Sequence, residues 1–267
     1  MALADDVANA MHVLEMLASR SEGRRVSEIA ERLGINKAIA HRLLAALVNA
    51  GYVSQDSRTS SYFATHSLGA LGLRQLSSSG VGTWAQRALD SLAADCEELV
   101  RLAVATNDSL QWIAKAQGSN SSLRLDPVMG QDAVPHATAS GKAWLSTLSS
   151  ERVGVVLEHE SRLSATPRSP LDRAGLLLEL DEVRQRGYAT TFEEMDLGIN
   201  AAAAPIYGSG PGREATGTIS IAGPSVRMTR ARMAELSPLL LAAAVEVARS
   251  WPSYTYLVAD EELSLPA

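Results

Sequence analysis

The sequence predicts an α+β protein with a small N-terminal domain of short helices and a hairpin, followed by a larger α/β domain. Three short stretches of helical periodicity within residues 7–51 precede a hairpin pattern, and strand-like runs bracketed by helical ones follow residue 84. Between them, Ser77-Ser78-Ser79-Gly80 has the composition of a domain boundary. The length of 267 residues suits one large domain or two smaller ones.

The N-terminal domain is expected to begin with three helices. Apolar residues at helical spacing predict the first over residues 7–19. Ser27 is expected to cap the second, which ends at Gly34, and Asn36 is expected to cap the third. The third helix should stop at Gly51, since a glycine after the last turn commonly ends a helix.

A β-hairpin is expected next. Two runs of aromatic and β-branched residues, 52–54 and 62–64, flank a polar turn. Three short helices followed by a hairpin are the order of a winged helix-turn-helix, in which the start of the third helix enters the DNA major groove. The same three-helix pattern also occurs in protein–protein modules, so an interaction module remains an alternative at this point.

Local charge favours the DNA-binding interpretation. The chain has a net charge of −6, yet residues 24–58 hold six basic and three acidic residues, a local charge of +3. Arg42 or Lys37 would donate to guanine or phosphate, and Ile39 would contact a thymine methyl group. The residues expected to contact DNA are Arg24, Arg25, Ser27, Lys37, Ala38, Ile39, His41, Arg42 and Arg58.

The C-terminal part alternates strands and helices, which predicts a mixed sheet with helices packed on it. Helices are expected over residues 67–79, over Trp84–Cys96, from a cap at Ser169-Pro170 with Asp172 in the first turn to Gly187, and after a cap at Thr229. Strands are expected around residues 99–105, 110–116, 188–191, 202–207 and 216–222. The expected domains are 1–66, a linker helix over 67–82, 83–251, and a tail over 252–267.

Composition excludes several classes of protein. Cys96 is the single cysteine, so neither an intrachain disulfide nor a thiolate metal cluster can form. Asp5 and Asp6 stand where a signal peptide needs basic residues, and the apolar run Leu239–Val245 is too short to span a bilayer. We therefore expect a cytoplasmic protein without a metal or a cofactor.

Val26–Val53 resembles the DNA-binding region of the IclR family of bacterial transcriptional regulators. The matching residues are Ile29–Lys37, His41–Leu44, Leu47 and Gly51-Tyr52. Ala38-Ile39 stand where the family usually has Ser-Thr, so the operator preference of relatives should not be copied to this chain. The resemblance implies a regulator that binds operator DNA. Because a single three-helix module offers too little surface for tight specific binding, we expect an even-numbered oligomer, a homodimer or a dimer of dimers.

The rest of the chain resembles the same family's effector domain, a GAF-like sheet with helices that binds a small organic acid. The matching stretches are Pro135–Ala143, Arg186–Tyr188, Glu193-Glu194, Ala203–Ile206 and Ile221–Pro224. The resemblance implies a pocket formed by Met129, Gly130, Ala137, Thr138, Thr191, Asn200, Ala201, Ser220 and Ala222.

The pocket positions differ from those of relatives that bind small keto acids. An aspartate, a cysteine and two serines there correspond to Thr191, Ala201, Ser220 and Ala222 here. The two alanines would enlarge the pocket and favour a bulkier acid, such as an aromatic one.

The residues themselves leave two alternatives open for this region. Alternation within residues 216–222 puts small polar residues on one face, which suits either a solvated edge or a ligand cavity. His136–Gly141 opens a helix whose free amides, near Ala137 and Thr138, could hold a carboxylate; plain packing of small residues is the other interpretation.

Enzyme motifs are weak in this sequence. Ser140-Gly141-Lys142 lacks the earlier glycine and the following Ser or Thr of a phosphate-binding loop. Gly208–Gly212 is not a dinucleotide-binding pattern, and the acidic pairs near Glu158 and Glu193 are typical of surface charge. The remaining alternative is an α/β enzyme or small-molecule-binding protein fused to a helical interaction module.

Overall fold

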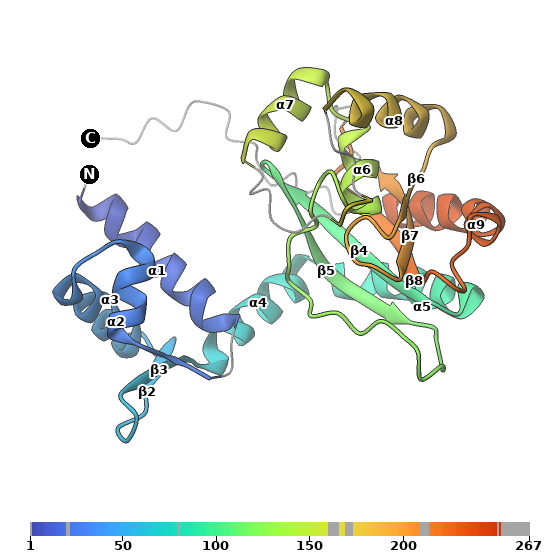
Figure 1. The fold of residues 1–267 in the computed structure, drawn as a ribbon. Coiled ribbons are helices and arrows are strands. Elements are labelled where there is room, and N and C mark those ends of the chain that lie inside the picture. Colours follow the sequence, from blue (N-terminus) through green and yellow to red (C-terminus); the bar gives the residue numbers. More distant parts are fainter. Residues whose placement is uncertain are drawn as a thin grey trace. The chain divides into compact units, whose positions relative to one another are not determined.

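The structure is a computed structural model that describes residues 2–19, 22–79, 81–159, 166–168, 173–208, 214–249 and 251. The chain divides into two compact units, Met1–Ser78 and Ser79–Ala267, and each is described here by itself (Figure 1).

Three helices form the body of the N-terminal unit: α1 (Ala2–Ala18), α2 (Val26–Leu33) and α3 (Lys37–Asn49). Their apolar faces meet in one core, whose most buried members include Val13, Ile29 and Leu44. The Asn36 side chain caps α3 by accepting a hydrogen bond from the Ile39 N–H at 2.9 Å, as expected.

The cap of α2 differs from the prediction. Arg25, not Ser27, is the capping residue, and Ser27 lies half-buried in the first turn. Instead of a hydroxyl cap, the Glu28 carboxylate reaches back and accepts a hydrogen bond from the Arg25 N–H at 3.0 Å. Gly34 ends the helix with a φ of 64°.

A three-stranded antiparallel sheet completes this unit, with β1 (Arg24–Arg25), β2 (Val53–Gln55) and β3 (Ser61–Ala64) in the order β1-β3-β2. β2 and β3 are the expected hairpin. β1 was not predicted, because two charged residues carry no strand pattern of their own and pair only through β3. Helix α4 (His66–Ser79) follows the hairpin.

The C-terminal unit is built on a five-stranded sheet in the order β5-β4-β8-β7-β6. The strands are β4 (Leu99–Thr106), β5 (Ser109–Gln117), β6 (Ala189–Phe192), β7 (Ile199–Ile206) and β8 (Gly217–Pro224). All four neighbouring pairs are antiparallel, so the expected mixed sheet is wrong. β4 and β5, and likewise β7 and β8, are consecutive strands that pair directly and antiparallel, which makes them hairpins rather than crossovers.

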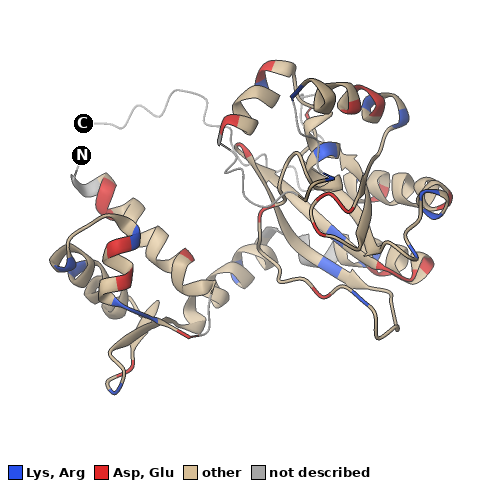
Figure 2. Cartoon of the chain, in the orientation of Figure 1, with Lys and Arg blue, Asp and Glu red and all other residues tan. Residues whose placement is uncertain are grey.

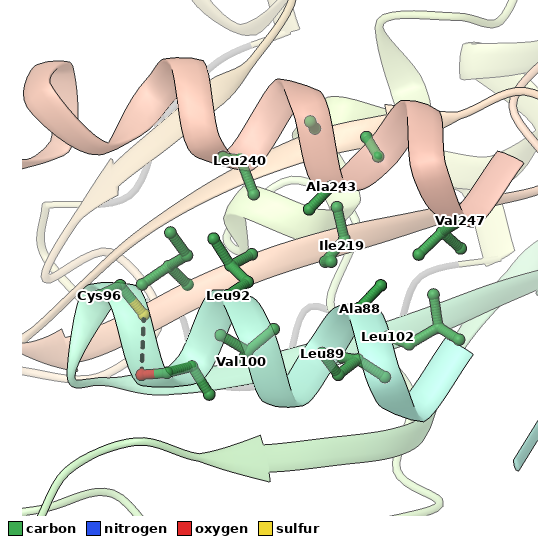
Figure 3. Packing of buried hydrophobic residues seen from close by; sticks show 14 of the residues in the cluster. Ala88, Leu89, Leu92, Cys96, Val100, Leu102, Ile219, Leu240, Ala243 and Val247 are labelled. Atoms are coloured by element: carbon green, nitrogen blue, oxygen red, sulfur yellow. Dashed lines mark hydrogen bonds between the residues drawn. The ribbon is translucent and has the colours of Figure 1, made fainter. Parts of the chain in front are cut away.

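The helices cover the two faces of the sheet. α5 (Val81–Cys96) and α9 (Arg230–Arg249) pack together on one face, where Leu92, Ile219 and Leu240 meet in the larger core (Figure 3). The small helix α6 (Ala139–Leu145) covers the opposite face over β6, β7 and β8. α7 (Ser150–His159) and α8 (Arg173–Arg186) pack with α6 around the buried Trp144.

Helix ends in this unit follow local signals. The Thr229 hydroxyl accepts a hydrogen bond from the Arg232 N–H at 3.2 Å and so caps α9, as expected. Gly187, with a φ of 83°, ends α8. The expected cap at Ser169-Pro170, Asp172 and the tail over 252–267 lie outside the described residues.

Candidate functional site

Helix α3 separates an apolar side from a polar one. Ala40, Leu43, Leu44 and Leu47 are buried against the other two helices. Lys37, Ala38, His41 and Arg42 are exposed, and all four lie in the first half of the helix. Ile39 is half-buried, so only part of its side chain is available to a partner. The start of α3 therefore has the polar, accessible surface that a groove-reading helix needs.

Arg42 has an acidic neighbour on another helix. Its guanidinium lies 3.4 Å from the Asp6 carboxylate of α1, and its own side chain is 67% exposed. An exposed ion pair of this kind stabilises a protein by ~0.2–1 kcal/mol. Arg42 can therefore exchange Asp6 for a DNA phosphate at little cost.

Arg24 and Arg25 do not share one environment, although both were expected to contact phosphate. Arg24 is 8% exposed, and its Nε finds no hydrogen-bond partner in the described part of the chain. The pairing of β1 with β3 turns it inward, beside the buried Tyr62. Arg24 is thus misplaced in the predicted interface, whereas the exposed Arg25 still fits it.

The hairpin tip is held by Asp56. Its carboxylate accepts hydrogen bonds from the Arg58 N–H at 2.8 Å and the Thr59 hydroxyl at 3.1 Å. The Arg58 N–H is the main cause of the lowered pKa of Asp56. Arg58 is exposed at the tip, and basic residues also lie on α3 and β1 in this unit (Figure 2).

Four of the positions expected to contact an effector lie together on the sheet face beneath α6. Thr191, Ala201 and Ala222 are consecutive register partners across β6, β7 and β8. Ser220 lies on the same face, two residues from Ala222 along β8. We call this surface the effector face.

The two alternatives for residues 216–222 can now be separated. β8 lies between β4 and β7, and every residue from Gly217 to Pro224 is buried, so this strand is not a solvated edge. Two of its hydroxyls, Thr218 Oγ1 and Ser220 Oγ, are buried without a hydrogen-bond partner among the described residues.

The Ala137 and Thr138 amides, near which a carboxylate was expected to bind, are not free. The N–H groups of Ala137 and Thr138 both donate to the Val134 carbonyl, at 3.3 and 3.1 Å. The Thr138 hydroxyl occupies the Gly141 N–H at 3.0 Å as the cap of α6. These amides are therefore already paired within the chain.

Asn200 is also misplaced in the predicted pocket. It precedes Ala201 on β7, so its side chain lies on the α9 side of the sheet, where its Nδ2 donates to the Met228 carbonyl at 2.8 Å. Met129 and Gly130 belong to a segment that pairs with β5: the Gly130 N–H donates to the Trp112 carbonyl at 2.9 Å, and Met129 packs against the cluster that contains Trp112.

Two cations on this side of the domain were not predicted. Lys142 of α6 is completely buried, with its Nζ 2.7 Å from a Glu179 oxygen and 2.5 Å from a Glu194 oxygen. Burial raises the pKa of Glu194, and Lys142 opposes that shift. A lysine in a run of small residues gives no sign from the sequence that it is buried.

Arg101 is the second cation that was not predicted. It lies on β4 opposite Ser220, and its guanidinium stands over the Trp112 ring, 3.8 Å from the centroid. Its Nε is buried without a partner among the described residues. All residues of Leu99–Ala105 except Arg101 are apolar, a pattern typical of a strand buried on both faces, and this could have indicated that Arg101 lies among buried residues.

Comparison with known families agrees with this architecture. The model described as "IclR helix-turn-helix domain" matches residues 7–57, and "Bacterial transcriptional regulator IclR C-terminal" matches residues 73–249. The chain belongs to the IclR family. It is therefore a DNA-binding transcriptional regulator of the IclR type.

Individual IclR relatives match this chain over most of their length. The acetate operon repressor of Salmonella typhimurium is 30% identical over 238 residues, which are 89% of this chain and 86% of the relative. The crystal structure of a regulator from Alicyclobacillus acidocaldarius has a TM-score of 0.80 at 27% identity, and the match covers 92% of this chain and 98% of that one.

A further IclR structure shares the fold only. An IclR homologue from Microbacterium hydrocarbonoxydans, complexed with 4-hydroxybenzoate, has a TM-score of 0.71 at 18% identity. The match covers 92% of this chain and 98% of the homologue.

Two cavities of this IclR-type chain lie away from the effector face. One is lined by residues that include Glu98, Ser119 and Arg227, and the other lies along α9 near Leu241 and Val245. In the part of the chain that is described, no helix is long and apolar enough to cross a membrane, and no group of three metal-binding side chains comes together.

Proposed function

We propose that this regulator acts in the cytoplasm, binds a near-palindromic operator through α3 and the β2–β3 hairpin, and controls a catabolic operon in response to a small organic acid. The observation that carries the DNA part is the surface of α3, where Lys37, His41 and Arg42 are exposed above a fully buried apolar side. Arg25 and Arg58 supply further exposed charge for the phosphate backbone.

We infer an even-numbered oligomer from the size of the interface. A single module of three helices and a hairpin buries ~600–1,000 Å² on DNA, which is small for tight specific binding. A homodimer, or a dimer of dimers, would bind two half-sites about one helical turn apart.

The DNA proposal is tested by selecting duplexes from a random pool with the full chain and measuring the affinity of the best duplex at several salt concentrations. Arg42→Ala should weaken binding and reduce the salt slope by about one, because one phosphate contact is lost. Arg87→Ala, the same charge change at an exposed position of α5, is the matched control. An unchanged slope in Arg42→Ala would contradict the role of α3.

The proposal of an acid effector is supported by the residues of the effector face. Thr191 and Ser220 are polar and buried there, and Ala201 and Ala222 form an apolar wall beside them. An aromatic ring needs such a wall, and a relative of the same fold is complexed with 4-hydroxybenzoate. α6 covers this face, so we propose that α6 and the segment before it shift outward when an acid binds.

The effector proposal is tested by thermal unfolding of the full chain with aromatic and aliphatic monocarboxylates, because a ligand that binds the native state raises its midpoint. We expect 4-hydroxybenzoate or benzoate to raise the midpoint and to change DNA affinity at the same concentration. If none of the acids does either, the effector proposal is wrong, while the DNA proposal stands on its own test.

A further inference from the structure

Arg101 and Lys115 share a register row with Ser220 of the effector face, and Lys142 lies on α6 above that face; among the described residues, only Arg101 of these three cations has no salt bridge. Lys115, the β5 neighbour of Arg101, lies 2.7 Å from the Asp126 carboxylate. Lys142 is held between Glu179 and Glu194. Arg101 has no ion pair with any carboxylate of the described residues. Lys115 and Lys142 are thus paired with carboxylates, whereas Arg101 is not paired with any carboxylate of the described residues.

The Arg101 side chain is held by stacking on an aromatic ring, but no described carboxylate forms a salt bridge with it. Its guanidinium is stacked on Trp112, and the Trp112 Nε1 donates to the Ser140 Oγ at 3.4 Å. Burial lowers the pKa of Arg101 to about 10, and the negative charge of Asp196 opposes that shift. The group remains a cation at neutral pH, in an environment that disfavours unpaired charge.

Two further polar groups lie next to it. Ser220 is the register partner of Arg101, and Thr218 is the partner of Ala103 on the same face. Their side chains are 1% and 0% exposed, and both hydroxyls lack a partner among the described residues. Buried polar groups are nearly always hydrogen-bonded, so three unsatisfied groups side by side require an explanation.

We propose that Arg101 binds the carboxylate of the effector through a charge-assisted hydrogen bond, with Ser220 and Thr218 as additional hydrogen-bonding partners. This inference rests on the proposed acid effector and names its anchor. A carboxylate supplies the negative charge that Arg101 lacks and acceptor oxygens for the two hydroxyls. The remainder of the acid then lies toward Ala222 and Ala201, which follow Ser220 on this face.

With Arg101 as the anchor, the carboxylate does not depend on the amides of Ala137 and Thr138. Ala137 and Thr138 donate within the chain, so they cannot supply the fixed donors that a buried carboxylate requires. Arg101 supplies them from a central strand instead, in an orientation fixed by Trp112. The effector class that follows is a small monocarboxylate, and its neutral amide should bind poorly.

The test uses the full-length protein with benzoate and 4-hydroxybenzoate as probes and their primary amides as matched neutral compounds. Binding is measured by calorimetry, and stability by the unfolding midpoint without ligand. We expect the acids to bind the wild type and the amides to bind at least about tenfold more weakly. Arg101→Met should lose at least about tenfold in acid affinity, and Arg101→Lys should retain part of it.

The ligand-free midpoint separates an anchor from a structural residue. Arg101 is half-buried and has no salt bridge among the described residues, so its removal should leave the midpoint of Arg101→Met unchanged or raise it, whereas loss of a structural residue would lower it. Lys115→Gln removes the adjacent cation, which is already paired, and should leave acid affinity within about twofold.

Three results would overturn the proposal: wild-type acid affinity in Arg101→Met, equal affinity of wild type for acids and amides, or equal losses in Arg101→Met and Lys115→Gln. In each case the acids still bind the wild type, so the proposed effector response survives. Failure of every acid to bind the wild type would instead refute the acid effector and its anchor together.

Discussion

The Arg42 guanidinium of α3 and the Asp6 carboxylate of α1 lie 3.4 Å apart on the surface of the N-terminal unit. In the proposed complex, Asp6 would compete with DNA for Arg42, one of the basic side chains of α3. Asp6→Asn should strengthen operator binding about twofold to fivefold, since an exposed pair contributes ~0.2–1 kcal/mol. Fluorescence anisotropy with the selected duplex measures this, and Asp5→Asn, one residue away, is the control for net charge.

Replacement of Ile39 tests direct base reading. The side chain is half-buried at the start of α3 and apolar. If its exposed part contacts a thymine methyl group, Ile39→Thr should change the preference at one base pair by about 1 kcal/mol. The control is Val48→Thr, later on the same helix, at a position that is 38% exposed. Identical selected sites for Ile39→Thr and the wild type would show that the residue does not read bases.

The Asp56 carboxylate should order the hairpin tip that presents Arg58. Asp56→Ala removes the acceptors for the Arg58 N–H and the Thr59 hydroxyl, so DNA affinity should fall and the tip amides should exchange faster. Asp56→Asn keeps one acceptor oxygen and should retain most of the affinity.

The same carboxylate gives a pH dependence with a definite sign. The pKa of Asp56 is lowered below its ordinary value of 3.8, so the charged form favours the folded tip. Its contribution is complete above pH 3.8 and is lost only as the pH falls through the lower folded value. Tip-amide exchange in the wild type should therefore stay constant from pH 7 to pH 5 after correction for intrinsic rates.

Lys142 should be among the most sensitive positions of the C-terminal unit. Lys142→Met leaves Glu179 and Glu194 without their counter-ion, which should reduce the free energy of unfolding by roughly 3 kcal/mol or more. Adding Glu194→Gln should recover part of the loss. Denaturant unfolding of both variants measures this, and a neutral effect of Lys142→Met would contradict the buried ion cluster.

The reduction in the free energy of unfolding caused by Lys142→Met should become smaller as the pH falls. The pKa of Glu194 is already raised by burial, and removal of Lys142 takes away the charge that opposes this. A folded-state pKa above the unfolded value means that the native state binds the proton more tightly, so stability rises as the pH falls toward the unfolded value near 4.5. Unfolding at pH 7 and pH 5 tests the sign.

Ala201→Leu tests the apolar wall of the effector face. The added carbons lie beside Ala222 and Thr191, where the ring of an aromatic acid is proposed to bind. Affinity for 4-hydroxybenzoate should fall sharply, while ligand-free operator binding remains near that of the wild type. Ala201→Ser, which adds little volume, serves as the control. A response to the acid at unchanged concentration in Ala201→Leu would place the pocket elsewhere.

Features set by neighbouring residues could be predicted from the sequence. The caps at Asn36 and Thr229 depend on residues within one turn, and both are present. Arg24 and Lys142 were misjudged or missed because their burial depends on partners far along the chain: Tyr62 for the first, and Glu179 and Glu194 for the second. The antiparallel sheet was missed for the same reason, since strand direction is decided by pairing rather than by local pattern.

The position of β8 determines where a response to ligand can begin. The strand is paired on both sides and buried along its whole length, so its amides should be among the slowest in the domain to exchange with deuterated water. The strand therefore holds the Ser220 and Thr218 side chains in fixed positions. Because β8 is held on both sides, the proposed effector response assigns the movement to the short helix α6 above it rather than to the strand.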